Sequence, residues 1–441
     1  MKYKIRIILI FACIAQVVLL TQAIVKGKPW LTGDSPVYIN LAHSMINGIG
    51  YGRMCQAGFV IEPTRLPGYP GFIGLLFTVF GDNNLWIILA QSVLYLAAVY
   101  FTYKIAIKTF GKGTAIVFLS FSSIYPFIPY AAAQISPEIP SLFFITVGLY
   151  FLSNPKILNL ILSAISLSVA AYIRPNLILL GFFISFFCLI FSKENRKNYL
   201  VIPVIVFILF LPWAIRNYYT FGKFTPTAIV SGVGVSFFVS SWEGLISPRT
   251  ITEFNDKGTF NDEARSSGFA SQLEGITNKV RECCPDDNDA VATSVANCDS
   301  LAKVTVIENE MFRLGIENIK AHPIEYLWNC FKNMFRMWFT YYGFADYAIY
   351  IKFPLILLGV LALLLGICGI IFTITGNQLS LRNPLLISLL VTIFYFPATL
   401  SLLNTQARYT IPARLLLLLF ASFAIIRFEE IIFGGSKTKF E

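Results

Sequence analysis

Long stretches of apolar residues recur along the chain, separated by short polar or basic segments. An apolar stretch of about 20 residues is long enough to cross a lipid bilayer as a helix. Stretches near that length predict ten membrane-spanning helices, at about residues 5–25, 84–108, 114–132, 139–153, 157–173, 176–192, 199–215, 352–374, 384–403 and 411–432.

Three other stretches mix apolar and polar positions or are too short to span. Val37, Leu41 and Met45 form a weak helical stripe soon after the first span. Residues 66–80 are apolar but short, and residues 310–343 are mixed and rich in aromatic side chains. Segments of this kind are expected to lie at the membrane surface as interfacial helices.

Composition places the chain among membrane proteins. Hydrophobic residues make up 56% of the 441 positions, charged residues only 13%, and the mean hydropathy is +0.68. A soluble domain is about 25% charged. The predicted fold class is therefore an all-α polytopic integral membrane protein with about ten spans, amphipathic interfacial helices and a small outward-facing module. The first 25 residues resemble a signal peptide, but no cleavage site of small residues follows, so we expect a retained helix.

The net charge of +10 is unevenly distributed. Residues 241–310 contain 13 acidic and 6 basic residues, a local balance of −7, so the remainder of the chain carries +17. Much of this excess lies in short loops, which indicates membrane topology rather than nucleic-acid binding. With ten spans, the basic loops fall on one side, which predicts cytoplasmic termini and a place in the cytoplasmic (inner) membrane. Residues 34–69, 134–138 and 217–351 then face outward.

This topology divides the chain into three parts: 1–216, a transmembrane module with the first outward loop; 217–351, an outward segment; and 352–441, a C-terminal transmembrane module. The acidic insertion at 245–309 holds Cys283, Cys284 and Cys298. An oxidising compartment permits a disulfide between Cys298 and one of the other two. A zinc site is the alternative, although only three thiols and no nearby histidine are available.

Two carboxylates stand at the predicted outer membrane face. Asp34, in G-D-S-P, is also placed to cap the helix in which Pro36 occupies the first turn. Glu138, in Q-I-S-P-E-I-P, is the only carboxylate in residues 113–153 and would favour the positive end of a helix capped by Ser136. Helix capping explains both residue types. A carboxylate at the membrane face is nevertheless costly unless it is paired or used, so both are candidates for chemistry.

Arginines gather on the same predicted face. Arg174, Arg216 and Arg408 lie at the outer ends of spans, against the charge bias that orients the chain. Arg65 lies in the first outward loop, and Arg414 lies about one turn into the last span. Single arginines can reach the headgroups simply to keep their charge in water. Several guanidiniums on one face instead predict a site for an anionic lipid phosphate, which arginine binds with two parallel hydrogen bonds.

The residue inventory excludes other kinds of active site. The chain has only two histidines, His43 and His322, so a histidine-based nucleophilic triad is not expected. Gly48, Gly50 and Gly52 alternate in an outward loop rather than between a strand and a helix, so they do not form a nucleotide-binding motif.

Six short segments resemble the GT-C membrane glycosyltransferases, and in particular the family 39-like branch of protein mannosyltransferases and lipid A aminoarabinose transferases. In chain order they are D-S-P-x-Y-x-x-x-A from Asp34, R-L-P-G-Y-P-G-F from Arg65, S-P-E ending at Glu138, R-P-N from Arg174, P-W-A-I-R-N-Y-Y-T-F-G-K-F from Pro212 and R-Y-T-I-P from Arg408. The matches are spread over most of the chain and leave out residues 245–309. Their order and spacing make the combination more specific than any one segment.

The resemblance implies transfer of a sugar, with inversion, from a polyprenyl-phosphate donor to an acceptor at the outer face. The matched aspartate, Asp34, would be the catalytic carboxylate, assisted by Glu138. The basic residue before the proline-rich element contacts the donor phosphate in the family, which points to Arg65. The other arginines assigned to the phosphate are Arg174, Arg216 and Arg408.

Further roles follow from the same resemblance. Tyr38, Tyr69 and Tyr409, which fall within matched segments, are assigned to substrate binding. In some members the acidic residue before the basic one helps to bind a metal, and here that residue would be Glu62. Two residues separate Glu62 from Arg65, a departure from the family spacing. A divalent metal ion is the only cofactor under consideration.

The inventory also suits this chemistry without the resemblance. Displacement at an anomeric carbon needs a base for the acceptor, whereas a phosphate leaves as a stable anion and needs no general acid. Two alternatives remain open. One is a glycan polymerase or ligase that uses a diphosphate-linked donor, and the other is a transporter or flippase, which would need polar residues at mid-membrane depth. The sequence specifies neither the sugar nor the acceptor, whether protein, lipid or glycan.

Overall fold

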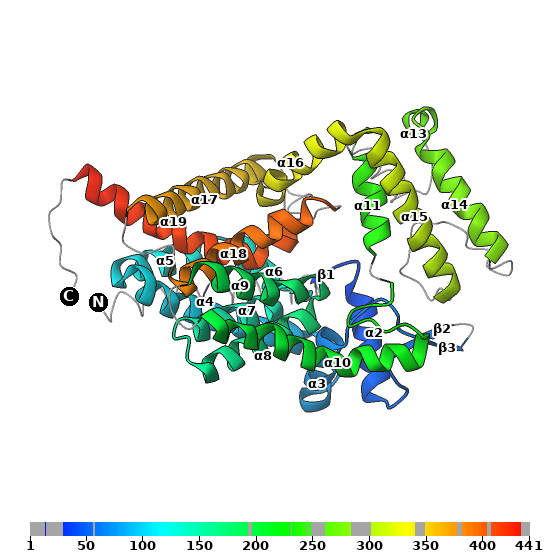
Figure 1. The fold of residues 1–441 in the computed structure, drawn as a ribbon, viewed down its shortest axis with the longest axis horizontal. Helices are drawn as coiled ribbons and strands as arrows, with labels where there is room; N and C mark the ends of the chain where they lie inside the picture. The colour runs from blue at the N-terminus through cyan, green and yellow to red at the C-terminus, as the bar shows by residue number, and fades with distance from the viewer. Residues whose placement is uncertain are drawn as a thin grey trace.

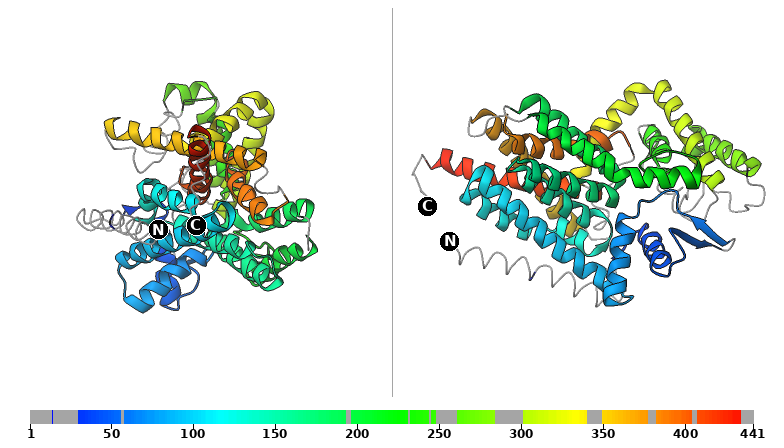
Figure 2. Two further views of the ribbon diagram at one scale, coloured as in Figure 1. Left: turned by 90° about the vertical axis from the view of Figure 1, so that its left-hand side faces the viewer. Right: turned by 60° about the horizontal axis from the view of Figure 1, so that its bottom comes forward.

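A computed structural model describes residues 14, 30–55, 58–192, 196–230, 232–243, 245–247, 261–283, 301–339, 349–376, 382–403 and 407–433. Within these ranges the chain is helical apart from short turns, loops and four short strands. The long helices lie side by side along the long axis, and a smaller group of helices stands at one end (Figures 1 and 2). The fold is that of an all-α polytopic membrane protein.

The bundle combines helices from both halves of the chain. They are α4 (Asn84–Phe110), α5 (Lys112–Ile124), α6 (Phe127–Ala132), α7 (Glu138–Leu152), α8 (Ile157–Ile173), α9 (Ile178–Phe191), α10 (Val201–Phe221), α17 (Ile349–Thr375), α18 (Pro384–Leu400) and α19 (Ile411–Ile432). Three 3-10 turns join them: η1 (Pro175–Leu177), η2 (Arg196–Leu200) and η4 (Ala407–Thr410). Helix α19 lies inside the bundle, packed on α17, α5, α7 and α18.

The sequence of α19 explains its central place. It is apolar around most of its circumference, and every residue from Ile411 to Ala424 is buried. Its approach to α17 requires glycine, because a Cβ added at Gly369 would lie 1.9 Å from the Phe420 carbonyl oxygen. Small residues at helix contacts allow backbones to approach closely within membranes. The last helix of the chain is therefore fixed against elements that precede it by hundreds of residues.

The predicted spans from residue 84 onward correspond to bundle helices, with one correction. The single span predicted at 114–132 is divided into α5 and α6, because Tyr125 is extended and Pro126 disfavours helix in the residue before it. By length and composition, three described helices qualify as membrane spans: Asn84–Phe110, Arg196–Phe221 and Phe353–Thr375. The predicted first span at 5–25 lies outside the described residues except for position 14, so the count of ten stays a prediction.

Helices at one end of the structure share a small core of their own: α11 (Val233–Trp242), α13 (Asp262–Ser266), α14 (Phe269–Cys283) and α15 (Leu301–Ala321). Helix α16 (Pro323–Phe339) follows α15 and packs on α17 and α18. Phe238, Trp242 and Met311 are among the side chains buried in that core. Cys284 and Cys298 lie outside the described residues, as does the Cys283 side chain, so the predicted disulfide is not described. The division into 1–216, 217–351 and 352–441 stays a prediction.

The described residues from Trp30 to Phe80 fold into a compact unit beside the bundle. It contains β1 (Trp30–Leu31), α2 (Ser35–Ile46), the strands β2 (Gly52–Cys55) and β3 (Gly58–Ile61), and α3 (Gly68–Phe80). Both helices expected in this loop are confirmed. Strands β2 and β3 form an antiparallel hairpin, while β1 pairs in parallel with β4 (Gln134–Ile135) just before α7. A Cβ at Gly68 would lie 2.5 Å from the Tyr172 backbone, so glycine lets α3 begin directly against α8.

Candidate active site

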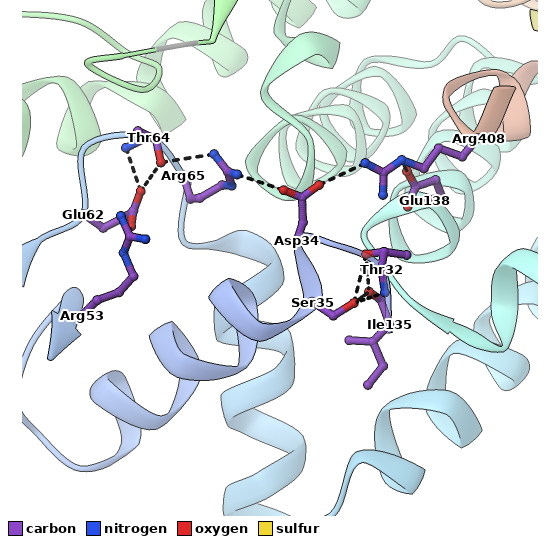
Figure 3. A network of polar contacts seen from close by, with 10 residues as sticks. All are labelled: Thr32, Asp34, Ser35, Arg53, Glu62, Thr64, Arg65, Ile135, Glu138 and Arg408. Atoms are coloured by element: carbon purple, nitrogen blue, oxygen red, sulfur yellow. Dashed lines mark hydrogen bonds and ion pairs between the residues drawn. The ribbon is translucent and has the colours of Figure 1, made fainter. Parts of the chain in front are cut away.

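The turn that carries Asp34 is fixed by short backbone contacts. Leu31 pairs with Ile135 in the β1–β4 ladder. The Ser35 hydroxyl donates to the Ile135 carbonyl oxygen at 2.7 Å and accepts from the Thr32 amide at 2.7 Å. Pairing of β1 with β4 therefore brings the start of α2 next to the start of α7 (Figure 3). Asp34 and Glu138 are placed near each other by this junction.

Asp34 occupies the N-cap position of α2, but its carboxylate does not cap the helix. Each carboxylate oxygen instead accepts from a different arginine. Arg65 Nη2 donates to Oδ1 at 3.0 Å, and Arg408 Nη2 donates to Oδ2 at 3.0 Å (Figure 3). Helix capping would explain an aspartate at this position, but it does not explain the contacts of the Asp34 side chain. The Asp34 side chain remains 36% exposed, so the pair of arginines holds a carboxylate that is still accessible.

Glu138 extends this cluster toward the bundle. It is the first residue of α7, with Pro137 at the N-cap position, so Ser136 does not occupy the cap position considered from the sequence. Its Oε1 lies 3.7 Å from Arg408 Nε and 3.6 Å from Arg174 Nη1. Its Oε2 is buried and has no hydrogen-bond partner among the residues that the structure describes. A buried carboxylate oxygen without a donor is costly, which favours a role for Glu138 when a substrate is bound.

Arg174 closes the cluster on its buried side. It follows α8 in an extended conformation before Pro175, and its guanidinium lies over the Tyr409 ring at 4.9 Å. The Arg408 guanidinium lies near the same ring at 5.5 Å. Tyr409 therefore contacts two of the predicted phosphate-binding arginines and keeps both directed toward Glu138.

Glu62 and Thr64, which precede Arg65, restrain its side chain on the side of Asp34 opposite Arg408. Glu62 is 1% exposed, and its Oε2 lies 3.0 Å from Arg53 Nε of strand β2. Glu62 Oε1 accepts from the Thr64 amide at 2.8 Å and also from the Thr64 hydroxyl. The Thr64 hydroxyl oxygen accepts in turn from Arg65 Nη1 at 3.1 Å (Figure 3). Alternating charges thus run from the hairpin through Arg65 to Asp34.

The charges of this row nearly cancel. The four arginines are Arg53, Arg65, Arg408 and Arg174, and the three carboxylates are Glu62, Asp34 and Glu138, which gives 4 − 3 = +1. The row is therefore slightly positive, and each of its guanidiniums has an anionic neighbour.

The arginines lower the pKa of Asp34. Burial alone would raise this pKa, but the charges of Arg65 and Arg408 and their hydrogen bonds outweigh that effect. Burial opposes the charge of Arg408, yet Glu138, Tyr409 and Asp34 together raise its pKa. Burial raises the pKa of Tyr38 to about 12, so its phenol stays neutral at physiological pH. The site therefore holds ionised Asp34 between charged arginines at neutral pH.

The three predicted tyrosines are placed differently. Tyr38 lies 5.9 Å from the Arg65 guanidinium, so it stands beside the site. Tyr409 lies within the arginine cluster. Tyr69 is fully buried, packs edge-on against Tyr38 at 4.9 Å and donates to Gln91 Oε1 at 2.8 Å. Its contacts support the Tyr38 ring from behind, and direct contact with substrate stays a prediction.

Two other arginines do not contact Asp34. Arg216 stacks on Trp213 at 4.7 Å and lies 5.8 Å from the Tyr51 ring, which places it on the hairpin side of Arg65. Arg414 is 1% exposed and donates to the Met337 carbonyl oxygen at 2.8 Å. The sequence placed Arg414 among the outward arginines, but its side chain instead joins α19 to the end of α16.

The family resemblance assigns Glu62 to a metal site, but the groups around Glu62 do not suit a metal ion. Its two oxygens face Arg53 and Thr64, and the two oxygens of Asp34 face arginines. Among the described residues, no group of three or more His, Cys, Asp or Glu side chains is arranged to hold an ion. The donor set thus suits guanidinium pairing rather than metal coordination.

The sequence analysis missed Arg53, Thr64 and Tyr51. Tyr51 donates from its hydroxyl to the Arg65 carbonyl oxygen at 3.1 Å. The available signal was the spacing of Tyr51, just before β2, and Arg53, within it, at alternate positions of the chain, but the hairpin pairing is needed to place them beside residues 62–65.

Comparisons with known proteins agree with this fold. Residues 63–215 match the family model described as dolichyl-phosphate-mannose-protein mannosyltransferase. The Archaeoglobus fulgidus oligosaccharyltransferase in its apo form superposes with a TM-score of 0.53 and 14% identity, over 96% of this chain and 51% of that one. This chain has the GT-C glycosyltransferase fold.

Two further solved structures are also similar to this chain. The A. fulgidus oligosaccharyltransferase AglB, in complex with an inhibitory peptide and a dolichol-phosphate, gives a TM-score of 0.52 and 12% identity over 97% of this chain and 52% of that one. ArnT from Cupriavidus metallidurans bound to undecaprenyl phosphate gives 0.38 and 13%, over 95% and 77%. The GT-C chain spans about half the length of the oligosaccharyltransferases. A comparison with curated proteins gives no match.

The family match covers only part of the site. Arg65, Glu138 and Arg174 lie within residues 63–215, whereas Asp34 and Arg408 lie outside them. The GT-C fold joins these two residues to the matched segment.

Proposed function

We propose that this GT-C protein transfers a sugar from a polyprenyl-phosphate-linked donor to an acceptor at the outer face of the cytoplasmic membrane. The observation that carries the proposal is the Asp34 carboxylate held between Arg65 and Arg408, each at 3.0 Å. A base for the acceptor and cations for a leaving phosphate are then within one hydrogen bond of each other. Both termini would lie on the cytoplasmic side.

The reaction is a single displacement with inversion. Asp34 takes the proton of the acceptor hydroxyl as its oxygen attacks the anomeric carbon of the donor. The bond between that carbon and the phosphate oxygen breaks, and its electron pair leaves with the polyprenyl phosphate. Arg65 and Arg408 stabilise the negative charge that develops on the phosphate, and each well-placed donor is worth a few kcal/mol. No general acid is required, because the phosphate leaves as an anion.

This scheme requires the arginines to exchange partners. A base with a lowered pKa and both oxygens bonded is a weak base. A donor phosphate competes with Asp34 for Arg65 and Arg408, and it thereby frees a carboxylate oxygen for the acceptor. Glu138, with its unbonded Oε2, would orient the acceptor or the sugar beside Asp34.

The remaining residues divide by position. Arg174 and Tyr409 keep Arg408 in place from the buried side, and Tyr38 offers a neutral hydroxyl beside Arg65. Arg216 lies farther along, where it would meet the donor lipid next to its phosphate. An apolar pocket bordered by Phe207, Phe210 and Phe224 lies between α9 and α10, close to Arg216 in the chain, and would take prenyl units.

The test uses purified protein in lipid with a panel of polyprenyl-monophosphate sugars and an extract of candidate acceptors. Release of free polyprenyl phosphate is followed by mass spectrometry. We expect release with one sugar, dependent on acceptor, and its loss in Asp34→Asn but not in Glu310→Gln, which alters ion pairs with Lys279 of α14 and Arg313 of α15. Turnover that is unimpaired in Asp34→Asn would remove Asp34 from the mechanism. No release from any monophosphate-linked donor, together with release of polyprenyl diphosphate from a diphosphate-linked oligosaccharide offered in parallel, would instead identify a glycan polymerase or ligase.

A further inference from the structure

The segment 62–65 is held in place by the hairpin behind it. Tyr51 precedes β2 and Arg53 lies within it, two positions apart on the same face of an extended chain. Tyr51 binds the Arg65 carbonyl oxygen through its hydroxyl, and its own carbonyl accepts from the Glu62 amide at 3.1 Å. Arg53, 8% exposed, pairs with Glu62. One hairpin face therefore contacts both ends of this short segment.

The contacts within the segment determine where the Arg65 side chain points. Glu62 accepts both donors of Thr64, which fixes the Thr64 hydroxyl oxygen. That oxygen binds Arg65 Nη1, so Nη2 of the same guanidinium is the nitrogen directed at Asp34. A guanidinium is planar and rigid, so restraint of one nitrogen orients the other. The order of dependence runs from Arg53 through Glu62 and Thr64 to Arg65.

We propose that Arg53 is a positioning residue for the transfer reaction: through its buried ion pair with Glu62 it fixes Arg65 in the orientation that holds Asp34 and receives the donor phosphate. The inference rests on the proposed function and gives Glu62 a role that is not metal binding. The described ion pair of Arg53 is with Glu62, not with Asp34. The effect proposed here passes from Arg53 through Glu62 and Thr64 to Arg65.

The groups around each end of this relay are known from the structure. Asp34 is faced by Arg65 from the 62–65 segment, by Arg408 from η4 and by Tyr38 from α2, with Glu138 of α7 beyond Arg408. Loss of Arg65 from this set leaves Arg408 as the single cation bonded to Asp34.

Glu62 is surrounded by a second set of groups. Arg53 and Thr64 contact it directly, while Tyr51 and Arg216 lie within electrostatic range. Without Arg53, Arg216 is the described cation near Glu62 that does not contact Asp34. Glu62 would then turn toward Arg216 and away from Thr64, and the Thr64 hydroxyl would no longer hold the Arg65 guanidinium in place.

The main test is the double variant R53M/E62M in the full chain. Removal of one partner leaves a buried charge unpaired and risks misfolding, whereas replacement of both by apolar side chains of similar length keeps the segment packed. R53K is the conservative variant, because it retains the charge but not the planar fork. R313Q is the control, since the ion pairs of Arg313 join it to Glu310 and Glu317 on α15 itself.

Two measurements separate positioning from simple support of the fold. The first is the dissociation constant for polyprenyl phosphate without sugar, measured by native mass spectrometry. The second is the pH dependence of kcat/KM. We expect R53M/E62M to bind the lipid phosphate about tenfold more weakly and to shift the acid limb of the profile to higher pH, because Arg65 then lowers the pKa of Asp34 less. R53K is expected to lie between this variant and wild type, and R313Q to match wild type.

Equal lipid-phosphate affinity and an unmoved acid limb in R53M/E62M would overturn the proposal. The same conclusion follows if activity falls only in proportion to the folded fraction. Failure of the proposed function looks different: wild-type protein would neither bind polyprenyl phosphate nor release it from any donor. A structure of R53M/E62M supplies a readout independent of turnover, and an unchanged bond between Arg65 Nη2 and Asp34 Oδ1 would also refute the positioning role.

Discussion

Replacement of Asp34 by asparagine should strengthen the binding of polyprenyl phosphate while it abolishes transfer. In the free protein, the carboxylate occupies one nitrogen of Arg65 and one of Arg408, at 3.0 Å each. These are the guanidiniums proposed to receive the phosphate. The aspartate and the phosphate therefore compete for the same donors and repel each other.

The magnitude follows from the geometry. Two hydrogen bonds of about 3 Å in series place a phosphate about 6 Å from the carboxylate. At that separation, two unit charges repel by about 0.7 kcal/mol in water and about 2.8 kcal/mol at an effective dielectric constant of 20. Asp34 is 36% exposed, which argues for a value between these limits. A gain of about 1–2 kcal/mol corresponds to binding about 5–30 times tighter.

The assay is a titration of purified protein with polyprenyl phosphate, followed by native mass spectrometry at low and high salt. Glu310→Gln removes a carboxylate from α15 and controls for the change in net charge. Affinity that is unchanged or weaker in Asp34→Asn, together with unchanged affinity in the control, would show that the phosphate does not bind beside Asp34. The partner exchange in the proposed reaction would then be wrong.

Further predictions concern the other groups of the site. Protonation of Asp34 should not lower wild-type kcat/KM between about pH 7 and pH 5, because the arginines lower the pKa of this carboxyl group. The folding stability that Asp34 supplies is present above its unfolded pKa, and it is lost only as the pH falls through the lower pKa of the folded state. Arg408→Gln should weaken lipid-phosphate binding at least about tenfold and raise the acid limb of the pH profile, and an unmoved limb would contradict the role of Arg408 in the Asp34 pKa. Arg216→Gln should weaken lipid-phosphate binding less than Arg65→Gln in the same titration; the reverse order would move the phosphate site toward the hairpin. Gly369→Ala should lower stability by about 1–3 kcal/mol, seen as a lower Tm with an unchanged pH profile, because its Cβ would meet the Phe420 carbonyl.

Periodicity predicted the helices well, because apolar stretches of membrane length have few alternative structures. It failed at Tyr125, where the restriction comes from Pro126 and not from hydropathy. Residue type and predicted face also selected Asp34 and Glu138. The side-chain contacts of these two residues could not be predicted from the sequence, because helix capping and catalysis both favour an acidic residue at the start of a helix.

Long-range partners were the least predictable part of the site. Arg53 looks like an ordinary polar residue of a loop until the hairpin register places it on Glu62. Arg414 was grouped with the outward arginines because it lies about one turn into the last predicted span. Its actual contact, with the end of α16, depends on packing between distant helices.

The bond between Asp34 and Arg408 joins residues 374 positions apart. At about 5–20 residues per second, the ribosome needs roughly 20–75 s to make the intervening chain. During that interval the nascent protein carries its aspartate and Arg65 at the membrane but lacks the second cation. Under the proposed function, a partly synthesised chain would offer a lipid phosphate only one of the two cations that hold Asp34. Synthesis of η4 supplies Arg408, so the proposed site would form only after most of the chain has been made.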